Sequence, residues 1–234
     1  MSSPLMTWDN FSRSLELPTE LEQVNVILDR QRGYEASLTN GDIFLSRTDL
    51  RMHIDRCRLD ARVKLQELYS QAHMVDPNAL PDLILHAAAW LKVSPHNTNQ
   101  LVKDYPDLVR HRDGNGSLPL HTCVRSVGDD HCERLGPFLD LFPEAAQCLD
   151  GDGILPLHCA LICGADCRVV RMLLECYMDA CKYIFPPSSP VKKEFVKYIG
   201  MLPVHLAFCC SSVDVIYCLL LQSPEVLSEA GNGN

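Results

Sequence analysis

A four-residue phrase, Leu-Pro-Leu-His or Leu-Pro-Val-His, occurs three times and constrains the fold more than any other feature of the sequence. A weaker copy lies upstream, and the four copies end in histidines that are 35, 37 and 47 residues apart. Self-similarity at such a period is typical of repeat proteins, in which each unit is one supersecondary motif that stacks on the next. The histidines are His86, His121, His158 and His205.

The residues around each phrase predict one local plan. A glycine shortly before the phrase supplies the positive φ of a tight turn, and the proline, at the first helical position, presets φ without losing a hydrogen bond. The helix that begins there spans only about two and a half turns, and helices this short are marginal alone. Each unit therefore predicts a turn, a helix, a turn, a helix and a loop, stabilised by stacking on its neighbours.

An insertion interrupts the regular spacing. Twelve residues separate Val109, near the end of the first unit, from His121, and the equivalent spacing is again 12 before His158 but 24 before His205. About twelve extra residues, centred on residues 185–193, therefore lie in the loop between the third and fourth units, where repeat proteins tolerate insertions. The four units span about residues 79–113, 114–150, 151–199 and 200–230.

Residues 1–78 precede the repeats and predict an N-terminal helical segment. Pro18-Thr19-Glu20 is a helix start signal, and from Thr48 onward apolar residues recur every three or four positions for more than twenty residues. That spacing predicts a long amphipathic helix. Packing against its own neighbours explains the stripe better than a dimeric coiled coil, because cysteine and alanine pack weakly at coiled-coil positions. The predicted buried residues are Leu50, Ile54, Cys57, Ala61, Leu65, Leu68 and Ala72.

The repeated phrase resembles the ankyrin repeat, whose signature runs D-x-x-G-x-T-P-L-H-x-A, then glycine, then a V-V-x-L-L helix. The glycine, the proline, the histidine and the leucines of the second helix agree in register in units two to four. The resemblance, over about residues 79–230, implies an all-α, ankyrin-like helical repeat solenoid (79–234) with an N-terminal helical segment (1–78). It also implies binding of other proteins through the hairpin loops and first helices, and no catalysis by the repeats themselves.

Two features depart from the ankyrin signature. The family's threonine is Leu118, Leu155 or Leu202 here, so some other partner must satisfy the histidine of each phrase. Gly136-Pro137 lies inside the second helix of unit two, where a proline is expected to kink or restart a helix.

The resemblance places the contact surface on the hairpin tips and first helices, with the insertion as a flanking finger. Within the insertion, Ser189 precedes Pro190 as in a proline-directed kinase site, and phosphorylation would add about −2 charge beside Lys192 and Lys193. A plain flexible loop is the simpler interpretation of these residues. The predicted partner-binding residues are Asn115, Ser117, Thr122, Arg125, Asp152, Ile154, Ile162 and Phe208.

Histidine and cysteine are abundant, but no pattern predicts a metal, a cofactor or a catalytic residue. Stacked helices place equivalent histidines about 10 Å apart, whereas zinc needs its ligands at about 2.1 Å. Cys159, Cys163 and Cys167 are the best zinc or redox candidates, but they lack a C-x-x-C pair. Asp113 and Asp150 begin calcium-like loops whose twelfth residue is not glutamate. No nucleophile elbow or phosphate-binding loop occurs.

The net charge and the hydropathy of the sequence limit the kinds of molecule that the protein is expected to bind. A net charge of −9 without clustered lysine and arginine argues against nucleic-acid binding. The longest apolar run, residues 215–221, is far shorter than the roughly 20 residues that span a membrane, and no signal peptide is evident. We expect a cytoplasmic protein, with the nucleus also compatible, whose twelve cysteines are reduced and whose partner is another protein.

Three hypotheses for function follow. We favour a non-catalytic protein-binding module, an adaptor or scaffold. A second hypothesis is a regulatory fragment of a larger enzyme, because Asn232-Gly233-Asn234 falls where a further glycine turn would begin. Val215, Ile216 and Leu220 would then lack a polar cover. A zinc or redox protein is the third hypothesis, and the cysteine spacing disfavours it.

Overall fold

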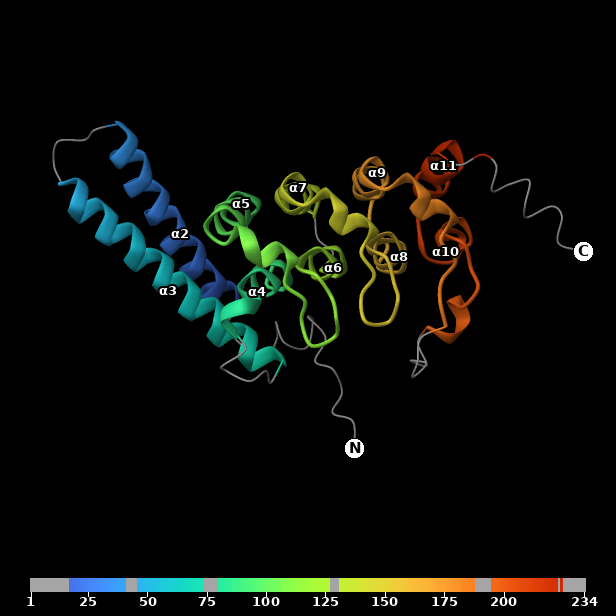
Figure 1. The fold of residues 1–234 in the computed structure, drawn as a ribbon, viewed down its shortest axis with the longest axis horizontal. Helices are drawn as coiled ribbons and strands as arrows, with labels where there is room; N and C mark the ends of the chain where they lie inside the picture. Colours follow the sequence, from blue (N-terminus) through green and yellow to red (C-terminus); the bar gives the residue numbers. More distant parts are fainter. Residues whose placement is uncertain are drawn as a thin grey trace, which may run out of the picture. The chain divides into compact units, whose positions relative to one another are not determined.

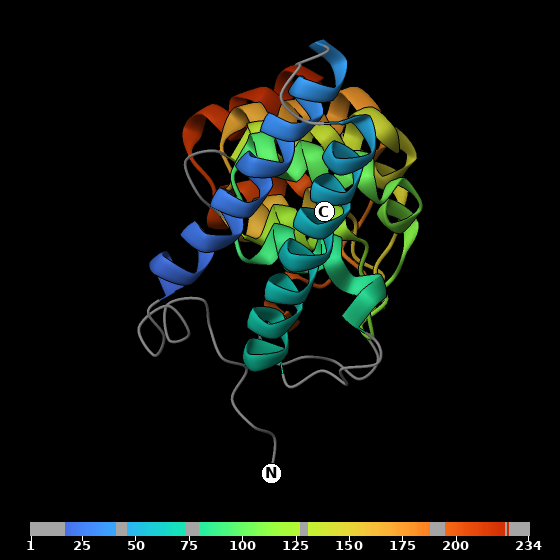
Figure 2. The ribbon, with the colours of Figure 1, turned by 90° about the vertical axis from the view of Figure 1, so that its left-hand side faces the viewer.

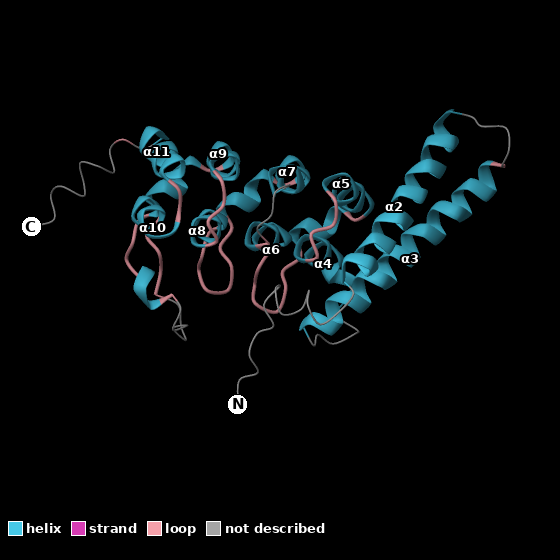
Figure 3. Cartoon of the chain, turned by 180° about the vertical axis from the view of Figure 1, so that it is seen from behind, coloured by secondary structure: helices cyan, strands magenta, loops and turns pink. Residues whose placement is uncertain are grey.

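The fold is all-α. The computed structural model describes residues 17–40, 46–73, 80–126, 131–187, 195–222 and 224. Within these ranges it contains ten α-helices, which pack largely in chain order, and five short 3₁₀ helices, without a strand (Figure 3). None of the described helices combines the length and the apolar character needed to cross a lipid bilayer. The helices fall into two compact units, Met1–Leu108 and Val109–Asn234.

The first unit is built on two long helices, α2 (Leu17–Asn40) and α3 (Arg47–His73), which run side by side in opposite directions (Figure 2). α3 is the longest helix described, and it lies where the apolar spacing predicts one. Its predicted stripe is buried against α2 and α4, apart from Ala72, whose side chain lies outside the described residues. The confirmed core positions on α3 are Leu50, Ile54, Cys57, Ala61, Leu65 and Leu68.

Two shorter helices complete this unit. The helix α4 (Ile84–Trp90) follows η1 (Leu80–Leu83), and all but its last residue are buried. The helix α5 (Pro95–Asp104) begins at Ser94, whose hydroxyl accepts a hydrogen bond from the Asn97 N–H, and η2 (Pro106–Arg110) follows it. A side-chain cap and a proline at the first helical position are the expected way to start such a helix.

A buried carboxylate ties α2, α3 and α5 together. The Asp104 side chain is only 4% exposed, and its oxygens lie 2.8 Å from the Arg58 guanidinium and 2.9 Å from the Gln31 amide nitrogen. The same guanidinium lies 3.2 Å from Glu35 on α2. Removing the arginine would leave the Asp104 carboxylate buried without its positive partner. The free-energy cost of such an unpaired charge exceeds the free energy that the ion pair contributes.

We therefore expect Arg58→Met to lower the free energy of unfolding by about 2 kcal/mol, which is less than the roughly 3–5 kcal/mol for a fully buried pair because Arg58 is partly exposed. Urea denaturation followed by circular dichroism measures the change. Arg51→Met, at an exposed arginine on the same helix, is the control and should change stability by less than about 0.5 kcal/mol. Equal effects of the two substitutions would contradict this assignment.

The second unit contains three helix pairs arranged in two layers. One layer holds the first helix of each pair (α6, α8 and α10) and the other holds the second (α7, α9 and α11), as Figure 1 shows. Each helix contacts its pair partner and the next helix of its own layer. The bounds are α6 (Pro119–Arg125), α7 (His131–Leu141), α8 (Pro156–Ile162), α9 (Cys167–Cys176), α10 (Pro203–Cys210) and α11 (Val213–Gln222), with η3 (Pro143–Gln147), η4 (Met178–Lys182) and η5 (Val196–Tyr198) in the loops.

The repeated phrase starts each first-layer helix in the same way. The leucine before the proline is the N-cap and has an extended backbone, and the proline is the first helical residue. The histidine Nδ1 atom then accepts a hydrogen bond from the backbone N–H of that leucine, at 3.2 Å in α6 and 3.3 Å in α8 and α10. The sequence lacks the threonine of the ankyrin signature and so did not identify a partner for this histidine. The bond to the leucine N–H is that partner.

The loops before α6 and α8 are tight hairpins closed by aspartate. Asp113 Oδ1 accepts hydrogen bonds from the N–H groups of Asn115 and Ser117, at 2.9 and 2.8 Å. Asp150 Oδ1 does the same for Asp152 and Ile154, at 2.9 Å each. The aspartates with calcium-like spacing therefore fold the turns, as expected for residues whose side chains mimic a backbone turn.

The two hairpins also contact each other. The N–H of Gly151 donates to the carbonyl of Asn115 at 2.9 Å, and a Cβ atom on Gly151 would lie 2.3 Å from that oxygen. Gly114 holds the equivalent position in the preceding hairpin, and a Cβ atom there would meet nothing within 4 Å. Glycine is therefore required at one of the two positions by close backbone approach.

Gly151→Ala should destabilise the second unit by about 1–3 kcal/mol, because a methyl group forces the two hairpins apart. Gly114→Ala is the matched control and should be neutral or stabilising by up to about 1 kcal/mol, since it reduces the freedom of the unfolded chain. Thermal and urea unfolding of both variants measure the difference. A stability order in which Gly114→Ala is the worse variant would contradict the contact between hairpins.

The structure corrects two expectations from the sequence. α7 does not restart at Pro137 but continues through it as one helix. The missing N–H removes one hydrogen bond, to the Glu133 carbonyl, and burial of Leu135 and Phe138 on either side holds the helix in place. On α11, Val215 is fully buried and Ile216 and Leu220 are half-buried. The apolar spacing correctly predicted a helix here, but it did not identify which side of the helix is buried. The exposed apolar residues of α11 are Val213, Tyr217 and Leu221.

Candidate functional site

The candidate binding surface is the face formed by the first-layer helices α6, α8 and α10, with the hairpins and the insertion beside it. These three helices contain a single lysine, arginine, aspartate or glutamate, Arg125. The second-layer helices α7 and α9 carry three such residues each, and α11 carries one, Asp214. Most residues of α6 and α8 are buried, so the first layer presents few charges to solvent, and charged residues are likewise depleted at the core of protein interfaces.

A pocket of about 190 Å³ lies on this face. It brings together three residues predicted from the sequence, Arg125, Ile154 and Ile162, although they are far apart in the chain. Its remaining walls come from two thiols of α8 and from one aromatic ring of the insertion. These residues are Cys159, Cys163 and Phe195.

Arg125 is held in place by the hairpins on either side of α6. Its Nη1 atom donates to the Ser117 hydroxyl at 2.9 Å, and its Nη2 atom forms an ion pair with Asp150. The Asp150 side chain is 1% exposed and that of Arg125 is 36% exposed. The negative end of the pair is therefore buried and the positive end faces the surface.

The insertion is anchored by aromatic packing. Phe185 is buried, and its ring centroid lies 5.4 Å from that of His158, 5.9 Å from that of Phe195 and 6.0 Å from that of Tyr198. Its backbone N–H donates to the Met201 carbonyl at 2.8 Å, and its carbonyl accepts from the Gly200 N–H at 3.0 Å. These contacts hold the base of the insertion and place Phe195 at the pocket.

Two buried histidines, His121 and His158, use both ring nitrogens. Because Nδ1 accepts from the N–H at the start of its own helix, the proton lies on Nε2, which donates to a carbonyl of a following segment. For His121 this carbonyl belongs to Ile154, at 3.3 Å, and for His158 to Tyr183, at 3.0 Å. Neither ring has a nitrogen left to bind a metal ion.

Both rings are held in the neutral form. Burial, with a smaller contribution from the positive charge of Arg125, lowers the pKa of His121 to about 4 against the opposing effect of Asp150. Burial likewise lowers the pKa of His158 to about 4. Since an exposed histidine titrates near pH 6.5, the unfolded chain takes up protons between pH 6.5 and 4 and the folded chain does not.

The folded state should therefore lose stability as the pH falls from 6.5 towards 4. Between pH 7.5 and pH 5.0 we expect the free energy of unfolding to fall by about 2 kcal/mol for each of His121 and His158. Urea denaturation at the two pH values measures this. His158→Gln should remove about one proton from the pH dependence. An unaltered pH dependence in His158→Gln would contradict the assignment.

The thiols of the pocket are protonated at neutral pH. Burial raises the pKa of Cys159 to about 12, and the nearby Arg125 only partly offsets this. Burial also raises the pKa of Cys163. A thiol in this form is a poor nucleophile and a poor metal ligand. Over the part of the chain that the structure describes, no three histidine, cysteine, aspartate or glutamate side chains come close enough to hold a metal ion.

The remaining sequence-predicted residues lie at different depths. Phe208, on α10, is 63% exposed, Asn115 is exposed at a hairpin tip, and Asp152 is half-buried. Ser117, Thr122 and Ile154 are buried. Ser189 lies outside the described residues. Partner contacts by these residues stay predictions.

Sequence reasoning missed Phe195. This phenylalanine follows Lys192-Lys193-Glu194 at the edge of the insertion, and an aromatic residue within a polar inserted loop was the available signal. Its place beside Ile154 depends on contacts between segments about forty residues apart, which no local pattern reveals.

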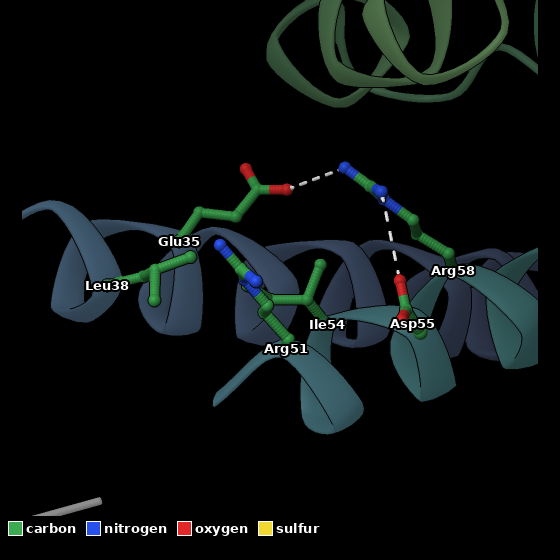
Figure 4. A pocket seen from close by; sticks show the side chains of 6 residues that line it. All are labelled: Glu35, Leu38, Arg51, Ile54, Asp55 and Arg58. Atoms are coloured by element: carbon green, nitrogen blue, oxygen red, sulfur yellow. Dashed lines mark hydrogen bonds and ion pairs between the residues drawn. The ribbon is translucent and has the colours of Figure 1, made fainter. Parts of the chain in front are cut away.

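Two further pockets lie elsewhere. One, of about 310 Å³ in the first unit, is lined by residues of α2 and α3, and its charged side chains pair with one another (Figure 4). The other, of about 300 Å³, lies between α9 and α11 in the second layer. The first is lined by Glu35, Leu38, Arg51, Ile54, Asp55 and Arg58, and the second includes Cys167, Arg171, Asp214, Tyr217 and Cys218.

Comparison with known proteins adds no family to this description. No protein-family model matches the chain, and no curated protein matches it. The resemblance to ankyrin repeats therefore rests on the residues of the repeated phrase.

Proposed function

We propose that the chain is an ankyrin-like helical repeat solenoid preceded by an N-terminal helical segment, and that it is a non-catalytic protein-binding module. Its partner, another protein, binds to the hairpins and to the face of α6, α8 and α10. The observation that carries the proposal is the weakly charged first-layer face, whose pocket gathers Arg125, Ile154 and Ile162.

The repeat architecture is supported by how the short helices are stabilised. The helices α6 and α8 have seven residues each and α10 has eight, and such helices are marginal alone. At the start of each helix, the histidine of the repeated phrase accepts the equivalent hydrogen bond. Neighbouring helices of the layer pack on one another. Stability that depends on neighbouring units is the defining property of a solenoid.

Protein binding is supported by the chemistry of the surface. Interfaces are built around apolar and aromatic residues and arginine, and the first-layer helices present Phe208 on α10 and the positive end of Arg125 on α6. Catalysis is disfavoured because the nearby histidines are neutral with both nitrogens engaged and the thiols are protonated. A general base or nucleophile needs a free, suitably charged atom.

Proximity labelling in cells, followed by quantitative mass spectrometry, tests this proposal. Phe208→Glu should reduce labelling of the partner at least tenfold, because it places a charge on the binding face. Tyr217→Glu is the matched control, since Tyr217 is also 63% exposed but lies on α11 in the second layer, and it should leave labelling unchanged. Circular dichroism should show that both variants fold.

Two results would overturn the proposal. One is a set of labelled proteins no different from that of the labelling enzyme alone. The other is a partner whose labelling is unaffected by Phe208→Glu while Tyr217→Glu abolishes it, which would move the binding site to the second layer.

A further inference from the structure

The pocket on the first-layer face is built from parts that the fold fixes in place. Ile154 is 1% exposed and ends a hairpin whose turn is closed by Asp150. Cys159 on α8 and Cys163, the C-cap of that helix, lie about one helical turn apart, so both contribute to one wall. Ile162 and Phe195 are only partly buried and form the accessible part of the lining.

The size of the pocket limits what it can hold. Pockets for cofactors and drug-sized ligands measure roughly 300–1,000 Å³, whereas this one measures about 190 Å³. Its lining is apolar apart from the two neutral thiols and Arg125. A space of this size and character fits one large apolar side chain, the usual anchor of a protein interface.

One charged side chain lines the pocket, and it is positive in a chain of net charge −9. Arg125 is the only charged residue of the first-layer helices, and its partner Asp150 is buried. Electrostatic complementarity therefore favours an acidic ligand. Nucleic acid is a poorer fit, because phosphate binding needs a larger cluster of basic residues.

The site is also preorganised. The guanidinium of Arg125 is fixed by Ser117 and Asp150 before any ligand arrives, and the buried walls belong to a hairpin and a helix. Binding to a surface that is already ordered avoids part of the entropy cost of association.

We propose that this pocket anchors one leucine, isoleucine, methionine or phenylalanine side chain of a partner protein, from a segment whose adjacent aspartate or glutamate lies beside Arg125. The proposal rests on the protein-binding function proposed above and names the chemistry of the partner. The acidic neighbour sets the orientation and the apolar side chain supplies most of the affinity.

A random peptide library displayed on phage, selected against the full chain, tests the proposal. The selected peptides should share one large apolar residue with an aspartate or glutamate within about three positions. Fluorescence polarisation with synthetic copies then measures each contribution. Replacing the apolar residue by alanine should weaken binding at least tenfold, and replacing the acidic residue by its amide should weaken it about threefold to tenfold, with a smaller effect at high salt.

Protein variants locate the site. Ile162→Lys should weaken binding of the selected peptides at least tenfold, because it puts a positive charge into the pocket wall. Ile216→Lys is the control, since Ile216 is also partly buried but lies on α11, and it should not alter binding. Arg125 is left unchanged because its loss would strand Asp150. Circular dichroism and thermal unfolding show whether the variants are folded.

The outcomes separate the two proposals. The anchor site would be overturned by selected peptides that share no apolar residue, by selected peptides with basic flanks, or by equal binding to wild type and Ile162→Lys. Protein binding would stand in these cases if Phe208→Glu still removed labelling. Failure of both the selection and the labelling comparison would overturn the protein-binding function itself.

Discussion

The second unit depends on two neutral histidines, His121 and His158, each of which hydrogen-bonds to two segments of the chain. In α6 and α8 the Nδ1 atom accepts from the N–H at the start of the helix, and the Nε2 atom lies within hydrogen-bond distance of a carbonyl of a later segment. A short helix gains its start and its attachment to the next unit from one side chain. Burial makes this arrangement stable only for the uncharged ring, so the fold and the protonation state of the ring are inseparable.

The same construction shapes the surface proposed to bind a partner. Because the histidines and the phrase leucines are buried in the layers, the first-layer helices carry few charges, and their single arginine is held by the hairpins of two successive units. Asp150 closes one of these hairpins and also pairs with Arg125. The residues that shape the turns thus also orient the charged group of the proposed site.

Much of the fold could be predicted from the sequence, because periodicity and turn chemistry are local. The phrase correctly placed the starts of α6, α8 and α10, and the apolar spacing identified the buried stripe of α3. The pairing of Arg125 with Asp150, the second partner of each histidine and the position of Phe195 were not predictable, since they join segments 25 to about 40 residues apart. The exposed face of α11 was predicted wrongly because helical period alone does not say which side is covered. Protein binding and the family resemblance stay predictions.

The most direct test of this account is the tautomer of the buried rings. A long-range ¹H–¹⁵N correlation spectrum of uniformly labelled protein at pH 7 distinguishes an acceptor nitrogen from a protonated one in each imidazole. The account predicts that His121 and His158 are neutral, with the proton on Nε2 and Nδ1 as the acceptor. Rings protonated on Nδ1, or carrying protons on both nitrogens, would contradict it.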